Sequence, residues 1–309
     1  MRIALVTPAR PGTRSGNRHT ALRWAAFLRA AGHRVTISTE WNGAPADAML
    51  ALHARRSHAS IKAFPGPVIL ALTGTDVYHD IHYSPEARES LALADRLIVL
   101  QPKAAEEFST RKKVHVVVQS SSTRLRHHPV KGKFRISVIG HLRAVKDPLL
   151  ALRALQHVSR KIEVVQLGDL LEPELKPNTR DARYRWLGSV PHGRALRWLA
   201  SSHAMVISSR MEGGANVVCE ALRIGVPVLA SRISGNVGLL GERYAGYFKV
   251  GDERDLARLI ERAMEKSLYD RLKSQVARLR PTVAPGSEAR ALLASVASLS
   301  RSPRGPRRA

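Results

Sequence analysis

The sequence has 309 residues, 44% of them hydrophobic and 24% charged, and its 50 Lys and Arg outnumber its 25 Asp and Glu, which gives a formal net charge of +25. This length and composition are typical of a globular chain with two domains of roughly 150 residues each. No apolar stretch approaches the roughly 18 residues of a membrane span, and a single cysteine, Cys219, excludes an internal disulfide. The apolar run near the N-terminus is too short for the core of a signal peptide. We therefore expect a cytoplasmic protein without stable membrane insertion, with Cys219 as a buried filler.

The basic excess has two interpretations. It is the footprint expected of a nucleic-acid-binding protein, or it reflects an arginine-rich chain that handles small anionic substrates. The basic residues are spread along the whole chain, aromatic residues make up only 5%, and no helix-turn-helix, zinc-finger or RNP-like pattern occurs. We therefore expect small anionic substrates and no nucleic-acid partner.

Strand patterns alternate with helical segments in the first part of the chain. A helix is predicted at 17–31, where apolar residues recur at helical spacing before Gly32. Strands are predicted at 2–7, 32–39, 48–52, 67–73, 96–100 and 114–118. Together these elements predict a Rossmann-like N-terminal domain at 1–125.

A polar, basic segment at 119–133 has no apolar periodicity and is interpreted as a linker. The alternation then restarts and predicts a second Rossmann-like domain at 126–285. Its strands are predicted at 134–140, 162–168, 183–188, 204–208, 226–231 and 245–250, and its helices at 148–158, 193–202, 216–224 and 253–266. Residues 286–309 are interpreted as a C-terminal tail with a disordered end. The fold class is therefore α/β, with two parallel-sheet domains facing a central cleft in which a ligand is expected to bind.

The first strand and the first helix are joined by the loop "TPARPGTRSGN" at 7–17. Gly12 and Gly16 permit a tight turn, and the helix start at Asn17 offers free backbone N–H groups to an anion. The glycine spacing does not match a GxGxxG dinucleotide motif. Anion binding and a merely tight turn both remain open for this loop.

The stretch "SVIGHLRAVKDP" at 137–148 ends a strand in Gly140 and continues with three basic residues, His141, Arg143 and Lys146. Basic side chains at the carboxyl end of a strand can converge on a diphosphate, arginine through a bidentate fork and lysine as a point charge. The alternative is a solvated basic loop.

The stretch "SRMEGGANVVCEALRIGVPVLAS" at 209–231 places Glu212 before a glycine-containing loop and Glu220 in the helix that follows. The glycines let backbone N–H groups approach phosphate and sugar oxygens closely. Eight residues are roughly 2.2 helical turns, so the two carboxylates fall on nearly the same face. We expect one to contact a sugar and the other a ribose. The alternative, a dipole-stabilising Glu and a surface Glu, leaves the glycines and the flanking strands unexplained.

With these motifs, the sequence resembles the retaining GT-B glycosyltransferases of family four. The resemblance rests on Glu212 and Glu220 with the "ALRIGVPVLAS" that follows, on "SGNRHTALRWAAFLRAAGHRVTI", and on "VIGHLRAVKDP". It covers about residues 1 to 265 and implies a UDP-sugar donor, with no cofactor and no metal. The histidines at 53, 58, 79, 82, 127 and 128 likewise lack a convincing metal-ligand set.

The resemblance also assigns residues to roles. Lys146 would stabilise the leaving diphosphate, Glu212 would contact the sugar ring, and Glu220 would bind the ribose hydroxyls. Lys146, Arg143 and Glu212 are the predicted catalytic residues. The predicted donor-binding residues are Gly16, Asn17, Gly140, His141, Gly213, Gly214, Ala215, Asn216 and Glu220. The predicted acceptor- or sugar-binding residues are Gly12, Arg14, Thr75 and Asp76.

Two departures from the family pattern bear on these roles. His141 stands where the family usually has an arginine, so Arg143 is expected to supply the missing charge. In "LTGTDVYHDIHYS" at 72–84, Thr73 stands where many members have a histidine. Thr75 and Asp76 can bind a sugar hydroxyl there, but capping of a local turn explains Asp76 equally well.

Within the family, "TPARPGTRSGNRHTA", "ALTGTDVYHDI" and "IGHLRAVKDP" are similar to the selenosugar synthases of selenoneine biosynthesis. That similarity implies transfer of GlcNAc or glucose from a UDP-sugar to selenophosphate, with formation of a C–Se bond. Two alternatives remain: a family-four glycosyltransferase with a lipid or sugar acceptor, and a non-catalytic nucleotide- or nucleic-acid-binding protein. The sequence does not determine the oligomeric state or which UDP-sugar is used.

Overall fold

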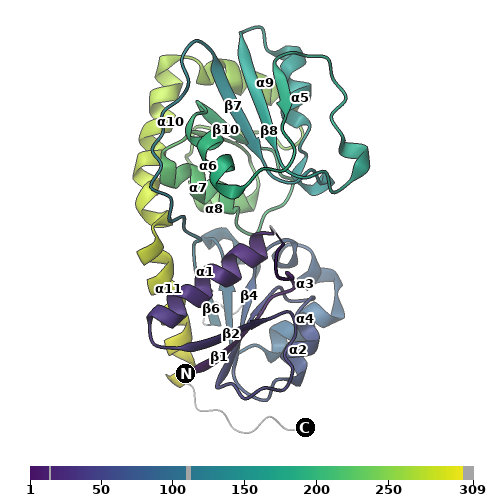
Figure 1. Ribbon diagram of the computed structural model, residues 1–309, viewed down its shortest axis with the longest axis vertical. Helices are drawn as coiled ribbons and strands as arrows, with labels where there is room; N and C mark the ends of the chain where they lie inside the picture. The colour runs from purple at the N-terminus through teal and green to yellow at the C-terminus, as the bar shows by residue number, and fades with distance from the viewer. Residues whose placement is uncertain (14, 109–112, 302–309) are drawn as a thin grey trace. The chain divides into compact units, whose positions relative to one another are not determined.

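The structure is a computed structural model that describes residues 1–13, 15–108 and 113–301 (Figure 1). The chain divides into two compact units: Met1–Gln119 together with the segment from Pro285 onward, and Ser120–Ala284. Each unit is an α/β structure with one six-stranded parallel sheet, which confirms the predicted fold class. No helix in the described ranges is long and apolar enough to cross a membrane.

The N-terminal unit has the strand order β2-β1-β3-β4-β5-β6. Its strands are β1 (Arg2–Val6), β2 (Arg34–Ser38), β3 (Ala48–Leu52), β4 (Val68–Leu72), β5 (Arg96–Val99) and β6 (Val114–Val116). Its α-helices are α1 (Gly16–Ala30), α2 (His58–Ala63), α3 (Asp80–Tyr83), α4 (Pro85–Leu93) and α11 (Pro285–Ala297). Strands β3 and β4 are buried along their whole length, as the continuous apolar runs of central parallel strands require.

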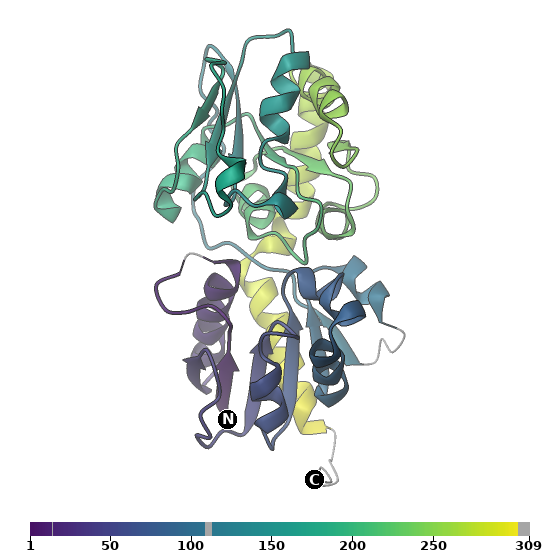
Figure 2. The ribbon, with the colours of Figure 1, turned by 90° about the vertical axis from the view of Figure 1, so that its right-hand side faces the viewer.

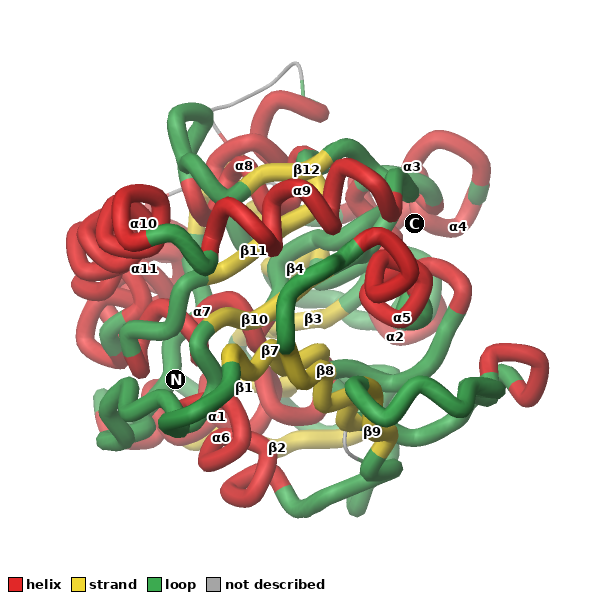
Figure 3. Tube along the Cα trace, turned by 90° about the horizontal axis from the view of Figure 1, so that it is seen from above, coloured by secondary structure: helices red, strands yellow, loops and turns green. Residues whose placement is uncertain are grey.

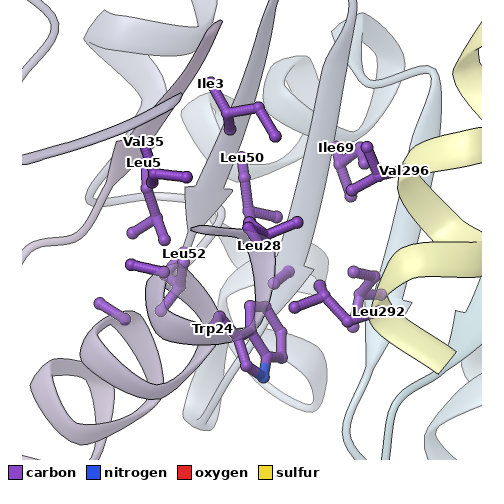
Figure 4. Close-up of a cluster of buried hydrophobic side chains, with 14 of the residues drawn as sticks. Ile3, Leu5, Trp24, Leu28, Val35, Leu50, Leu52, Ile69, Leu292 and Val296 are labelled. Carbon is purple, nitrogen blue, oxygen red and sulfur yellow. The ribbon is translucent and has the colours of Figure 1, made fainter. Parts of the chain in front are cut away.

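Helices cover both faces of this sheet, as Figure 2 shows. On one face, Trp24 and Leu28 of α1 pack with Leu292 and Val296 of α11 against the strands (Figure 4). On the other face, α2 and α4 close a second apolar cluster that includes Phe64. The unit therefore has one core layer on each side of the sheet.

The C-terminal helix corrects the predicted domain boundaries. Residues 286–309 were expected to form a tail, but α11 packs into the core of the N-terminal unit, while residues 302–309 lie outside the described residues. The buried Glu288 accepts hydrogen bonds from Trp24 Nε1 (2.7 Å) and from Arg23 Nε (2.7 Å) and Nη2 (3.1 Å). Because α11 is separated from the N-terminal unit by the whole of the C-terminal unit and no strand follows it, its pattern alone did not indicate which core it joins. The predicted linker at 119–133 begins at the point where the chain enters the second unit.

The C-terminal unit has the strand order β12-β11-β10-β7-β8-β9, which can be followed from above in Figure 3. Its strands are β7 (Phe134–Ile139), β8 (Ile162–Leu167), β9 (Tyr184–Trp186), β10 (Ala204–Ile207), β11 (Val228–Ser231) and β12 (Tyr247–Phe248). Its α-helices are α5 (Leu150–Ala154), α6 (His192–Ala200), α7 (Asn216–Ile224), α8 (Ser234–Leu240), α9 (Glu253–Ala263) and α10 (Lys266–Leu279). Helices α5 and α9 contact each other on one side of the sheet, and α6 and α7 do so on the other.

This strand order creates a switch point in the middle of the sheet. The chain proceeds outward from β7 through β8 to β9 and, in the other direction, from β10 through β11 to β12. At such a reversal, the connections that follow the two central strands diverge, and a crevice opens at the carboxyl ends of those strands. The connections after β7 and β10 therefore flank the position where an α/β sheet binds its ligand.

The predicted elements differ from the observed ones mainly in length and in the short helices. The helix predicted at 148–158 is the five-residue α5 followed by a 3₁₀ turn at Leu155–His157. Helices α2, α3, α4, α8, α10 and α11 were not predicted. The first four have at most nine residues, and such short segments show too few apolar repeats to stand out in the sequence.

Candidate functional site

The connections after β7 and β10 are joined to each other at the switch point of the C-terminal sheet. Ser208 Oγ donates hydrogen bonds to the carbonyl oxygens of Lys146 (3.0 Å) and Asp147 (2.8 Å). The backbone N–H of Arg210 donates to the carbonyl of Val145 at 2.9 Å. Two motifs that are about 65 residues apart in the sequence thus form one unit at the carboxyl edge of the sheet.

Lys146 and Glu212 meet in this unit as an ion pair. Lys146 lies at the end of a 3₁₀ turn, Ala144–Lys146, and its Nζ donates to Glu212 Oε1. Ser209 Oγ donates to the same carboxylate oxygen at 2.6 Å. Glu212 is 8% exposed, whereas about a third of the Lys146 side chain is open to solvent. The buried carboxylate therefore holds the ammonium group in place, while the Lys146 side chain as a whole remains partly exposed.

Asp147 gives the backbone its direction after Lys146, and the sequence analysis did not single it out. Its backbone is left-handed, with φ 41° and ψ 55°, a conformation that aspartate adopts more readily than most residues. The buried carboxylate accepts hydrogen bonds from Arg153 Nη2 (2.9 Å) and Arg210 Nη2 (3.1 Å). Two guanidinium groups thereby stabilise a strained turn next to Lys146. In the sequence, the Asp-Pro pair at 147–148 is the feature that could have indicated this turn.

Helix α8 packs against the backbone of Glu212. Ser231 Oγ donates to the carbonyl of Ser209 at 2.6 Å, and Asn236 Nδ2 donates to the carbonyl of Ser231 at 2.9 Å. Gly235 lies so close that a Cβ at this position would be 2.1 Å from the Glu212 carbonyl oxygen. The site therefore depends on a glycine and an asparagine that carry no chemistry of their own. They lie in the stretch "SGNVGLLG" at 234–241, which belongs to the motif that resembles the family, but the sequence analysis assigned them no role.

The start of α7 faces the same edge. The loop of Gly213 and Gly214 leads into the N-cap residue Ala215, whose side chain makes no capping hydrogen bond, and the first helical turn contains no acid. A helix that starts without a side-chain cap or an acid presents N–H groups and a positive dipole end to an anion. Anion binding by Gly213, Gly214, Ala215 and Asn216 stays a prediction, and the uncapped helix start is the feature that it requires.

Glu220, in the second half of α7, is paired with His192 at the start of α6. His192 Nε2 lies 2.7 Å from Glu220 Oε1, and this hydrogen bond raises the pKa of His192 above its ordinary value. The two glutamates of the motif therefore have separate partners, Lys146 for Glu212 and His192 for Glu220. His192 was not predicted, because its approach to Glu220 depends on the packing of α6 against α7.

His141 and Arg143 are directed toward acids of the β8–β9 connection. The backbone N–H of Asp169 donates to His141 Nδ1 at 3.1 Å, and Arg143 Nε lies 3.9 Å from Glu172 Oε1. The connection approaches closely because Gly168, at φ +147°, would place a Cβ 2.0 Å from the carbonyl oxygen of Gly140. The three basic residues predicted to converge thus have three different acidic neighbours: Asp169 for His141, Glu172 for Arg143 and Glu212 for Lys146.

The predicted residues of the N-terminal unit lie after β1 and β4. Gly12 adopts φ +82° in a turn, and α1 starts at Gly16, one residue earlier than predicted, with the Ser15 side chain accepting from the N–H of Arg18 at 3.3 Å. Asn17 is thus the second residue of α1 rather than its start. Arg14 lies outside the described residues.

Asp76 has the local role that the sequence analysis left open. Its fully buried carboxylate accepts from the N–H groups of Ala54 (3.1 Å), Gly74 (2.7 Å) and Thr73 (3.4 Å). A fully buried carboxylate with three backbone donors has no surface for a sugar hydroxyl. Asp76 therefore caps the local turn and is not available to bind a sugar. Thr75 begins the same 3₁₀ turn, Thr75–Val77, and its side chain lies outside the described residues.

No group of three or more His, Cys, Asp or Glu side chains is arranged to hold a metal ion in the described part of the chain. The expectation that the protein uses no metal and no cofactor stays a prediction. Cys219 is a buried free thiol within α7.

Comparison with known proteins gives the fold a name. Residues 133–266 match the family model described as "Glycosyl transferases group 1". Among solved structures, HepE from Anabaena in complex with UDP and glucose has a TM-score of 0.73 and 14% identity, and the match covers 96% of this chain and 100% of that one. Sucrose-phosphate synthase from Thermosynechococcus elongatus has a TM-score of 0.75 and 14% identity, with 97% and 99% covered. The lipopolysaccharide outer core galactosyltransferase WaaB has a TM-score of 0.70 and 12% identity, with 96% and 99% covered.

These matches establish the fold as GT-B and show that the C-terminal unit is similar to the group 1 glycosyl transferases. The match of residues 133–266 contains the Lys146–Glu212 pair, Glu220 and His192. Sequence identities of 12–14% to solved structures leave the donor, the acceptor and the stereochemistry to be argued from the site itself.

Proposed function

We propose that this protein is a retaining glycosyltransferase that transfers GlcNAc or glucose from a UDP-sugar to selenophosphate. The observation that carries the first part of the proposal is the Lys146–Glu212 pair at the switch point, beside the uncapped start of α7. It combines a fixed cation, a buried carboxylate and a helix dipole at one edge of a sheet. A sugar diphosphate presents the complementary groups: negative phosphates next to hydroxyl-bearing rings.

The donor would lie across this edge. The phosphates contact Lys146 Nζ and the backbone N–H groups at Gly214 to Asn216, the sugar hydroxyls contact Glu212, and the ribose hydroxyls contact Glu220. His192 Nε2 pairs with Oε1 of Glu220, which leaves the second oxygen of that carboxylate for the ribose. Solved structures of the similar HepE protein contain UDP and glucose or UDP-glucose, which supports the choice of nucleotide.

Catalysis is then electrostatic and positional. The anomeric C–O bond to the diphosphate breaks, its electron pair leaves with UDP, and Lys146 and the α7 amides stabilise the charge that develops there. Selenium of selenophosphate attacks the oxocarbenium-like anomeric carbon from the leaving-group face and forms the C–Se bond. An anionic nucleophile needs little help from a general base. Arg143, which lies beside Glu172, has a secondary role at most in this scheme.

The choice of selenophosphate rests on the sequence resemblance and on the excess of basic residues, which suits a pair of anionic substrates. A second candidate is transfer from the same donor to a sugar or lipid acceptor. It is favoured by the similar solved structures, which include sucrose-phosphate synthase and a lipopolysaccharide galactosyltransferase. Both candidates use the same donor site and differ only in the acceptor.

The deciding experiment measures UDP release from UDP-GlcNAc and from UDP-glucose, with and without selenophosphate, and examines the product by mass spectrometry. We expect release that depends on selenophosphate and a product with the isotope pattern of selenium bonded to a sugar. Release without a selenium-containing product would keep the glycosyltransferase and replace the acceptor. Folded protein that releases no UDP from either donor would leave the site as a nucleotide-binding site without catalysis.

A further inference from the structure

The C-terminal unit contains a hollow of about 290 Å³ that the proposed reaction does not use. It lies between the end of α7, helix α10 and the segment that leads to β7, and its lining includes His127, Gly225, Tyr269, Lys273 and Arg280 but no carboxylate. Figure 1 shows α7 and α10 next to each other within this unit. Helix α7 starts beside Glu212 and continues for nine residues, so its far end is about 13 Å from that edge. The hollow is therefore separate from the donor site.

Arg280 lines this hollow, and two further arginines flank it in the chain: Arg126 precedes the lining residue His127, and Arg223 lies two residues before the lining residue Gly225. Arg223 lies in the last turn of α7, and Arg280 follows α10 in the 3₁₀ turn η7 (Arg280–Val283), which contacts α7. In the described part of the chain, the Nε atoms of Arg223 and Arg280 are buried without a hydrogen-bond partner, and so is Oη of Tyr269. Buried polar groups normally have partners, and two of these three atoms belong to residues that line the hollow, Tyr269 and Arg280, so a partner is missing there.

Backbone contacts hold the segment of Arg126 against the end of α7. The N–H of His127 donates to the carbonyl of Ile224 at 3.2 Å. A Cβ at Gly225 would be 3.8 Å from the Cβ of His127, which is ordinary contact distance. The position of Arg126 is thus determined by the fold of this unit.

The cluster has an excess of positive charge that nothing in its described surroundings neutralises. Burial, and then the charges of Arg126 and Arg223, lower the pKa of the Arg280 guanidinium below its ordinary value. The acid nearest along α10, Asp270, forms an ion pair with Lys266. Like charges brought together in a partly buried hollow repel each other, and a bound anion converts that repulsion into attraction.

We propose that this arginine pocket, formed by Arg126, Arg223, Lys273 and Arg280, binds a phosphate group. Guanidinium groups fit phosphate oxygens in pairs, and Lys273 at the rim adds a point charge. The ring of Tyr269 and the neighbouring Pro129 and Ala277 offer an apolar wall for an organic group attached to the phosphate. A free phosphate ester and the headgroup of an anionic lipid share this chemistry. The proposal does not depend on the proposed reaction.

The test is isothermal titration of the full chain with inorganic phosphate and with pyrophosphate, in the presence of saturating UDP so that the donor site is filled. We expect binding to persist in Lys146→Ala and to weaken tenfold or more in Arg280→Gln and in Arg223→Gln. Arg271→Gln is the matched control, because Arg271 is exposed on α10, the helix that precedes Arg280, and does not line the hollow. Thermal unfolding of each variant shows whether it is folded, and two independent arginine variants keep the test valid if one is not.

Co-sedimentation with vesicles distinguishes the two sources of the phosphate. Binding to phosphatidic acid vesicles but not to phosphatidylcholine vesicles, lost in the two arginine variants and kept in Arg271→Gln, identifies a lipid headgroup. Binding of the free anions alone identifies a soluble phosphate ester. Anion and vesicle binding that folded Arg280→Gln and Arg223→Gln leave unchanged, or phosphate binding that disappears only in Lys146→Ala, would overturn the proposal.

Discussion

At the scale of single residues, the candidate site depends on charges placed in pairs. Glu212 is almost fully buried, and its carboxylate is compensated by the Lys146 ammonium and the Ser209 hydroxyl. A buried carboxylate without such partners would be costly, so the ion pair and the Ser209 hydrogen bond compensate the burial of Glu212. Lys146, in contrast, remains partly open to solvent. The pair is therefore asymmetric: the Glu212 carboxylate is buried, and the Lys146 side chain is partly exposed.

Removal of the ammonium group should abolish most of the activity without loss of the fold. Lys146→Ala is expected to lower kcat by about 100- to 1,000-fold, the usual effect of losing one group that stabilises charge in a transition state. UDP release under saturating donor measures it. The exposed Lys131→Ala is the control and should keep full activity. If Lys146→Ala retains near-normal turnover while its unfolding temperature is unchanged, the proposed role of Lys146 is wrong.

The pair of His192 and Glu220 predicts a pH dependence of stability. Because the hydrogen bond that His192 donates to Glu220 raises the pKa of His192, the pair contributes fully to stability below the unfolded pKa of about 6.5. This contribution is lost as the pH rises through the higher pKa of the folded protein. The His192 side chain is half exposed, so the shift in unfolding temperature is expected to be on the order of 1 °C.

The measurement compares wild type with His192→Gln at pH 5.5 and pH 9. The variant should be less stable than wild type at pH 5.5 and nearly equal to it at pH 9. A gap that widens toward high pH would contradict the assigned direction. The same variant should raise KM for the UDP-sugar more than it lowers kcat, because His192 orients a binding residue and does not contact the reacting atoms.

At the scale of elements, short helices determine where the functional side chains lie. Helix α8 approaches the backbone of Glu212 through Gly235, and the β8–β9 connection approaches Gly140 through Gly168. In both places a side chain is excluded because the neighbouring backbone occupies its volume. These close backbone contacts fix the connections at the carboxyl edge of the sheet relative to one another.

Gly235→Ala tests the contact between α8 and Glu212. The added Cβ would overlap the Glu212 carbonyl oxygen at 2.1 Å, so α8 or the Glu212 loop must move. We expect a loss of about 1–3 kcal/mol of stability and lower activity. Gly193→Ala, where only Arg197 Nη1 at 3.9 Å lies near the added Cβ, should be neutral or slightly stabilising. Equal behaviour of the two variants in urea denaturation and in UDP release would disprove the contact.

Helix α11 is joined to α1 by a buried ion pair and by apolar contacts. Glu288→Ala would leave Arg23 and Trp24 Nε1 without their acceptor and is expected to cost about 3–5 kcal/mol. Urea denaturation, with hydrogen exchange of the α1 and α11 segments to locate the effect, measures it. Arg290→Ala, an exposed change on the same helix, is the control. A Glu288→Ala variant within 0.5 kcal/mol of wild type would show that α11 packs without this pair.

At the scale of the whole molecule, the two units differ in how the chain builds them. The C-terminal unit is one continuous segment, Ser120–Ala284, whereas the N-terminal unit needs both ends of the sequence. Leu292 and Val296 of α11 fill the face of the sheet next to Trp24 and Leu28. Without α11, that apolar surface would be exposed to water.

This difference predicts the outcome of dissection. Residues 120–284 alone should unfold cooperatively, whereas residues 1–119 alone should aggregate or unfold without a sharp transition. Joining residues 285–301 to the shorter fragment should restore cooperative unfolding, which calorimetry measures. A stable, cooperative fragment of residues 1–119 would mean that α11 is an addition to that unit and not part of its core.

Much of this protein was determined by local sequence pattern. Alternating buried strands and helices predicted the α/β class, and glycines and charged residues directly after the strands predicted where the site lies, because parallel strands end at one edge of the sheet. Glu212, Lys146 and the start of α7 were predicted for this reason. Their roles in the reaction remain predictions.

The tertiary structure alone decided which side chains meet. Glu212 with Lys146, Glu220 with His192, and Glu288 with Trp24 are pairs whose members are 28 to 264 residues apart in the sequence. The pattern along a strand or helix is set by backbone geometry within a few residues and can be read from the sequence. Contacts between distant elements depend instead on how helices pack on a sheet, and that packing is a property of the whole chain.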